Sequence, residues 1–116
     1  MIASSQLARW EDLRSLGHAS LSSSYVGIGG SFTQPVRLIE IDNTTDANLI
    51  ISFDGVNAKR FISANTGKVL DIASDRNDIA KNLEQPVGDR IYVKLEAGST
   101  ATVGNVYVAV MYAGNH

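Results

Sequence analysis

The sequence is short of the residues on which most enzyme and metal sites depend. Its 116 residues include no cysteine, two histidines, two prolines and one tryptophan. The lack of cysteine excludes disulfides, thiolate metal sites and cysteine nucleophiles. No apolar run approaches the ~18 residues of a membrane span, and "MIASSQLARWEDL" lacks the basic start and apolar stretch of a signal peptide. We therefore expect no membrane partner and no export by a signal peptide.

Excess charge of either sign is also missing. Ten basic residues stand against twelve acidic ones, giving a net charge of −2, and basic residues cluster only as pairs such as Lys59-Arg60. A phosphate-tracking patch, and with it sequence-specific nucleic-acid binding, is therefore disfavoured. The charged fraction of 19% is a little low for a soluble domain. Surface with few charges is often covered by a partner.

Short alternating apolar segments, separated by turn-forming residues, make up most of the chain. The clearest are "RIYVKLE" and "NVYVAVMYA" near the C-terminal end. The second is apolar on both faces, which is typical of a central strand or of one covered by another subunit. About seven or eight such segments predict an all-β fold, an antiparallel β-sandwich or small barrel over residues 16–116. From Ser74 to Gly88 the pattern fades, and one helical turn is expected there.

The stretch "NTTDANLIISFDGVNAKRFI" combines aspartates with an apolar run. Alternation predicts a strand with Leu49, Ile51 and Phe53 facing the core. Asp46 and Asp54 then fall at the two ends of this strand. Aspartate is common at turns because its side chain accepts hydrogen bonds from nearby backbone N–H groups. We interpret both as turn residues rather than as metal ligands or catalytic acids.

Residues 1–15 differ from the rest of the chain and are expected to form a docking arm. Leu7, Trp10 and Leu13 recur every three residues, so the arm is predicted to contain a short helix. A helix of about three turns is marginal in isolation. The arm must therefore pack on this chain or on a neighbour, and both alternatives are open for Trp10.

No pattern of catalytic residues is apparent. A Ser-His-Asp triad needs a histidine base, and the sequence has two histidines. His18 lies near serines only because its segment is rich in serine, and His116 is the last residue, so neither indicates a triad. "GIGG" is followed by a loop and a strand rather than by the helix that a phosphate loop requires, and "NTGK" lacks the upstream glycine of that motif, so we expect both to be turns. We expect no enzymatic activity, no cofactor and no metal site. The residues expected to contact other subunits are Leu7, Trp10, Leu13, Tyr25, Tyr107 and Met111.

Three segments, "PVRLIEIDNTTDANLIISFDG", "PVGDRIYVK" and "GNVYVAVMYA", resemble a group of small virion proteins of tailed bacteriophages. The likeness spans about Leu16 to Ala113 and includes a Ser24-Tyr25 step. Its central string is matched by Ile41, Asn43, Thr45, Asp46, Ala47, Ile51, Ser52, Phe53, Asp54 and Gly55. Ser63-Ala64-Asn65 departs from the Pro-Ala-Gly type of turn in that group, which leaves the local turn open.

The resemblance implies a β-sandwich protein that assembles in many copies on the phage particle. The expected place is the head-to-tail junction, as a collar, neck or adaptor ring on the portal. One alternative is a capsid decoration or cement protein on the head surface, and another is a carbohydrate-binding module of a tail fibre or baseplate. The implied partners are further copies of the chain and portal, neck or capsid proteins. The implied location is the virion, assembled in the bacterial host cytoplasm.

Overall fold

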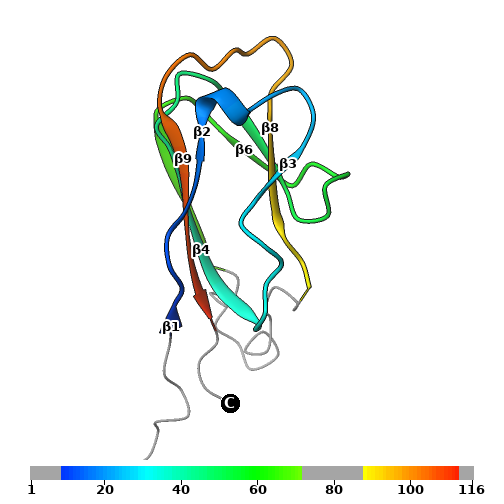
Figure 1. Ribbon diagram of the computed structural model, residues 1–116, viewed down its shortest axis with the longest axis vertical. Helices are drawn as coiled ribbons and strands as arrows, with labels where there is room; N and C mark the ends of the chain where they lie inside the picture. The colour runs from blue at the N-terminus through cyan, green and yellow to red at the C-terminus, as the bar shows by residue number, and fades with distance from the viewer. Residues whose placement is uncertain (1–8, 72–87, 113–116) are drawn as a thin grey trace, which may run out of the picture.

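A computed structural model describes residues 9–71 and 88–112, which form two stacked antiparallel sheets (Figure 1). The prediction of an all-β, sandwich-like fold is confirmed. The strands are β1 (Arg9–Trp10), β2 (Arg14–Gly17), β3 (Val26–Ile28), β4 (Val36–Asn43), β5 (Leu49–Ser52), β6 (Arg60–Ile62), β7 (Thr66–Asp71), β8 (Ile91–Leu95) and β9 (Asn105–Tyr112). A 3-10 turn, η2 (His18–Ser20), follows β2.

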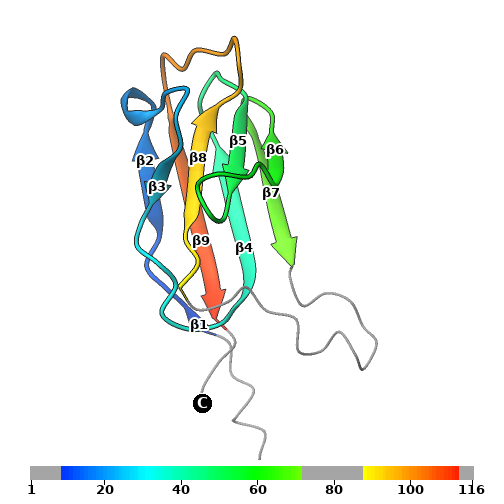
Figure 2. The same cartoon turned by 90° about the vertical axis from the view of Figure 1, so that its right-hand side faces the viewer.

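Sheet A has the order β1–β9–β4–β7, with β2 pairing to β9 on the same side as β1. Sheet B has the order β3–β8–β5–β6. Figure 2 shows sheet B in front of sheet A with all long strands running along the same axis. Strands β4 and β9 lie at the centre of sheet A, so each is paired along both of its edges.

The core lies between the sheets and follows the predicted alternation. In β9 the side chains of Val106, Val108 and Val110 are fully buried, as are Ile91 and Val93 in β8. Leu49 and Ile51 of β5 also face inward, and the half-buried Phe53 packs against the same core. Burying each such side chain stabilises the fold by about 1.5–3 kcal/mol relative to exposure.

Two of the connections between the sheets, β4 to β5 and β6 to β7, meet at a buried polar corner around Asn43. The chain passes from sheet A to sheet B after Asn43 and returns after Ile62. The Asn43 amide donates hydrogen bonds to the carbonyls of Ala47 (2.8 Å) and Ser63 (3.0 Å). Its side-chain oxygen accepts from the N–H (3.0 Å) and hydroxyl (2.6 Å) of Thr45. One side chain therefore satisfies backbone groups of both connections.

A third connection between the sheets, the loop from β8 to β9, packs against this corner through Gly104. The loop between β8 and β9 reaches Thr44, whose hydroxyl donates to the carbonyl of Asn105 (2.8 Å). Gly104 has φ +92°, and a Cβ on it would overlap the carbonyl of Thr44. Only glycine combines this backbone conformation with so close an approach.

The expected helical conformation of the N-terminal segment is not found in the part that the structure describes, where residues 9–17 are extended on β9. Trp10 pairs with Met111 and Arg14 pairs with Val108, so the segment holds one extra residue between them. Because of this extra residue, side chains three positions apart, such as Trp10 and Leu13, lie on the same side of the segment. A spacing of three is also typical of a helix, which is why the sequence suggested one. Strand pairing prevails because it covers the edge of β9.

Arg14 fixes this N-terminal strand to sheet B. Its guanidinium forms an ion pair with Glu11 and donates to the carbonyls of Ile28 and Gly30, each at 3.0 Å. It also lies 5.2 Å from the centre of the Phe32 ring. The Glu11 carboxylate in turn accepts a hydrogen bond from the Tyr112 hydroxyl. Residues 9–15 of the predicted docking arm are thus integrated into the sandwich, whereas residues 1–8 lie outside the described part.

Other local expectations are met in part. The serine- and glycine-rich segment from Ala19 to Gly30 contains one short strand, Val26–Ile28, which pairs with β8. The turn at Ser63-Ala64-Asn65 does form, with Asn65 in the left-handed region at φ 56°. The helical turn expected between Ser74 and Gly88 falls almost wholly outside the described residues.

Candidate interaction surface

The outer face of sheet A is the strongest candidate for a functional surface. The strand register brings three rows of outward side chains together across β9, β4 and β7. Ala109 pairs with Glu40, which pairs with Val69, while Met111 pairs with Leu38. On the other side of β9, Trp10 extends the Met111 row. We call this set face A: Trp10, Leu13, Leu38, Glu40, Asp42, Val69, Tyr107, Ala109 and Met111.

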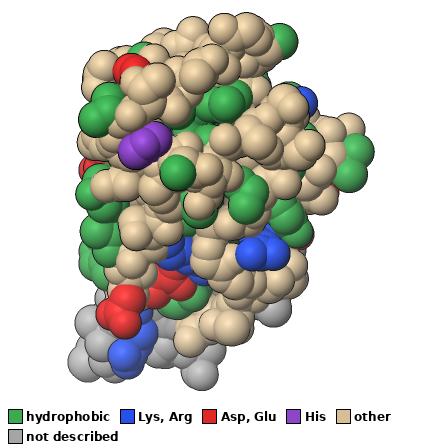
Figure 3. Space-filling view, turned by 45° about the horizontal axis from the view of Figure 1, so that its top comes forward, with side chains coloured by type: hydrophobic (Ala, Val, Ile, Leu, Met, Phe, Trp, Pro, Cys, Tyr) green, Lys and Arg blue, Asp and Glu red, His purple; other side chains and the backbone are tan. Residues whose placement is uncertain are grey.

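Apolar side chains on face A are far more exposed than core residues of the same type. The exposed fractions are 55% for Trp10, 62% for Leu13 and 55% for Val69. Hydrophobic atoms line the left-hand side of the molecule in Figure 3, where sheet A lies. A contiguous apolar patch of this kind is typical of an interaction site. Trp10 does not belong to the core of this chain, which answers one question that the sequence left open.

The charge on face A is acidic. Glu40 and Asp42 project from β4, and no residue that the register places on this face is basic. Within the described ranges, neither carboxylate takes part in an ion pair or hydrogen bond. Two carboxylates without partners, set among exposed apolar groups, favour a partner surface that carries positive charge.

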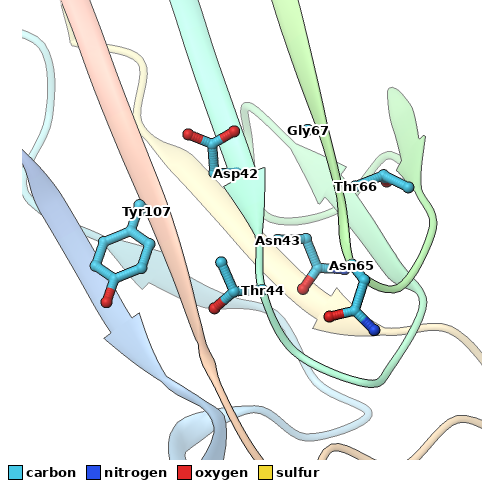
Figure 4. Close-up of a pocket in the computed structure, with 7 residues that line it drawn as sticks. All are labelled: Asp42, Asn43, Thr44, Asn65, Thr66, Gly67 and Tyr107. Atoms are coloured by element: carbon cyan, nitrogen blue, oxygen red, sulfur yellow. The ribbon is translucent and has the colours of Figure 1, made fainter.

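A hollow of about 370 Å³ lies at one end of face A and is lined by Asp42, Asn43, Thr44, Asn65, Thr66, Gly67 and Tyr107. Figure 4 shows the Tyr107 ring on β9 at one side, Thr66 and Gly67 on β7 at the other, and Asp42 on β4 between them. A Cβ on Gly67 would overlap the Asp42 carboxylate, so glycine keeps the hollow open. One carboxylate beside an aromatic ring suits a cationic group.

The outer face of sheet B has a different character. Lys94 pairs with Ile50, which pairs with Phe61, and Tyr92 lies next to them on β8. The Lys94 ammonium stands 4.7 Å above the centre of the Tyr25 ring. The Arg90 guanidinium lies 5.5 Å from that of Tyr92. We call this set face B: Tyr25, Ile50, Phe61, Arg90, Tyr92 and Lys94.

The interpretation of Asp46 and Asp54 as turn residues agrees with their hydrogen bonds. Asp46 accepts from the backbone N–H (2.8 Å) and the hydroxyl of Thr102. Asp54 accepts from the N–H groups of Val56 and Asn57, each at 2.8 Å. These bonds, led by the one from Asn57, hold the pKa of Asp54 far below its ordinary value, while the bonds from Thr102 lower the pKa of Asp46.

Other candidate groups have structural contacts of their own. The His18 ring nitrogen Nδ1 lies 3.1 Å from the carbonyl oxygen of Gly104, which also accepts the His18 backbone N–H at 3.0 Å. Across residues 9–71 and 88–112, no three His, Asp or Glu side chains gather closely enough to bind a metal ion. In the same ranges, no helix has the length and apolar character to cross a membrane.

The predicted interface residues separate into two groups. Trp10, Leu13, Tyr107 and Met111 lie together on face A, while Tyr25 lies on face B on the opposite side of the sandwich. Leu7 falls outside the described residues. The sequence did not single out Val69, Phe61 or Lys94. Strand alternation signals that Val69 and Phe61 point outward only when the register is known.

No protein-family model matches the sequence, and no curated protein matches it either.

Proposed function

We propose that this chain is a non-enzymatic structural subunit of a tailed-phage particle. It assembles in multiple copies at the head-to-tail junction, as part of a collar, neck or adaptor on the portal. The place on the particle rests on the resemblance of residues 16–113 to small phage virion proteins. A fold built from strands with opposed outer faces suits a subunit that contacts several neighbours.

The observation that carries the assembly role is face A. Four residues that the sequence marked as interface candidates lie on one side of one sheet, although they come from β1, β9 and the link to β2. Tryptophan and tyrosine are frequent anchors of protein interfaces. An exposed sheet face with these side chains is the kind of surface that subunits bury on assembly.

Labelling of particles tests the proposal directly. An antibody against this chain, bound to purified phage particles and viewed by electron microscopy, is expected to mark the junction of head and tail. Label spread over the head surface would instead support the decoration alternative. Particles assembled while the chain is produced, but free of it by mass spectrometry, would overturn the proposal.

A further inference from the structure

We propose that face A of one copy docks on face B of a second copy, so that the chain associates head to tail. This inference rests on the proposed assembly role and names the partner of face A. It identifies that partner as the same chain, through a different surface.

The first argument is charge complementarity between the two faces. Face A presents the carboxylates of Glu40 and Asp42, whereas face B presents the cationic groups of Lys94 and Arg90. Within the described residues, none of these four side chains takes part in an ion pair. Two acids beside face B accept hydrogen bonds within the chain: Asp54 from the N–H groups of Val56 and Asn57, and Glu96, two residues after Lys94, from the Asn48 amide at 3.1 Å. Both faces therefore keep charge for a partner.

The second argument is the match in apolar character. Face A contributes three side chains that are more than half exposed, and face B contributes Phe61, which is 41% exposed, beside the half-buried Ile50 and Tyr92. Aromatic and aliphatic groups of this size supply the buried centre of an interface, around which the charged groups fix the orientation.

The third argument excludes pairing of like faces. A twofold contact of face A with face A would place Glu40 and Asp42 against their own copies. A contact of face B with face B would do the same with Lys94 and Arg90. Juxtaposed like charges oppose both contacts by several kcal/mol, whereas the head-to-tail contact joins opposite charges. A head-to-tail contact leaves one free face at each end, so association continues into a ring or an open stack.

Two exposed substitutions test this arrangement in the full chain. Val69→Lys places a cation next to Glu40 on face A, and Phe61→Glu places an acid on face B. Val103→Lys is the control, because Val103 is 57% exposed against 55% for Val69 but lies in the loop between β8 and β9. Sedimentation velocity over a range of concentrations measures association, and circular dichroism verifies folding.

We expect the wild type and Val103→Lys to associate as concentration rises. Val69→Lys and Phe61→Glu should each associate at least about tenfold more weakly, equivalent to the loss of about 1.4 kcal/mol. An equal mixture of these two variants should regain association, because the intact face B of one meets the intact face A of the other.

Two results would overturn the inference. If Phe61→Glu alone associates like the wild type while Val69→Lys does not, face A pairs with itself. If the wild type stays monomeric at millimolar concentration, face A binds something other than this chain. Neither result touches the labelling of particles, so failure of this inference and failure of the proposed function are distinguishable.

Discussion

The corner around Asn43 and face A invert the usual distribution of polar and apolar groups in opposite ways. At the corner, polar side chains are buried: Asn43 is 1% exposed and Thr45 is fully buried. On face A, large apolar side chains such as Trp10 and Leu13 are exposed. Strand β4 contributes to both regions, Asn43 to the corner and Glu40 to face A, so the contrast occurs within one sheet.

The two inversions have different physical meanings. Buried polar groups stabilise a fold when every hydrogen bond is made, and the Asn43 side chain makes four. Exposed apolar groups add little to the stability of a monomer, but they favour association. Substitutions at the corner should therefore change stability, and substitutions on face A should change assembly.

The largest effect on stability is expected for Asn43→Ala. It leaves the carbonyls of Ala47 and Ser63 without their donor in a buried site, which should lower the free energy of unfolding by about 2–4 kcal/mol. Thermal denaturation followed by circular dichroism measures it, with a fall in Tm of roughly 10 °C or more. Asn57→Ala, in an exposed loop, is the matched control. Equal, small effects for both would show that the corner carries no special stability.

A pair of glycines separates backbone conformation from close packing. Gly98 and Gly104 have similar φ values of +88° and +92°, but only Gly104 lies against another backbone, that of Thr44. Gly98→Ala should cost about 1 kcal/mol for the left-handed conformation, and Gly104→Ala about 2–3 kcal/mol because Thr44 must also shift. Urea denaturation of both variants gives the difference. Indistinguishable values would mean that the contact relaxes without cost.

Much of the fold was predictable because alternation and turn chemistry act locally. The inward faces of β5, β8 and β9 follow from the order of apolar and polar residues alone. Asp54 was recognisable as a turn residue, because its carboxylate accepts hydrogen bonds from Val56 and Asn57 in the same loop. Asp46 lies in a bend as expected, but its carboxylate bonds to Thr102 of a distant loop, which the local pattern does not reveal.

The corner and the N-terminal strand were not predictable, because the contacts that determine them join residues far apart in the sequence. Asn43 is buried because Ser63, 20 residues later, returns beside it, and sequence alone marks it only as a turn former. Phe32 lies in the link between β3 and β4, outside any strand, yet it is 1% exposed. The extended form of residues 9–17 depends on β9, about 90 residues away, and the gathering of face A depends on that pairing.

The loop between β5 and β6, which contains Asp54, predicts how stability changes in acid. Because the folded-state pKa of Asp54 is depressed, its carboxylate contributes stability above the unfolded value of about 3.9, and this contribution is lost as pH falls below it. Asp54→Asn should therefore lose less stability than the wild type between about pH 5 and pH 2. Urea denaturation across that range measures the slopes. Parallel curves for both proteins would contradict a role for the Asp54 turn in acid sensitivity.

The smallest effect on stability is expected on face A itself. Leu13→Ser removes an apolar side chain that is 62% exposed, so the free energy of unfolding should stay within about 0.5 kcal/mol of the wild type. The measurement belongs at concentrations where the chain is monomeric, because association would add apparent stability. Leu49→Ser, in the core, is the contrasting control and should unfold the chain or cost several kcal/mol. A loss of more than ~1.5 kcal/mol for Leu13→Ser would exceed what exposed positions show. It would place Leu13 among the residues that hold the sandwich together, and face A would then be part of the fold rather than a surface for assembly.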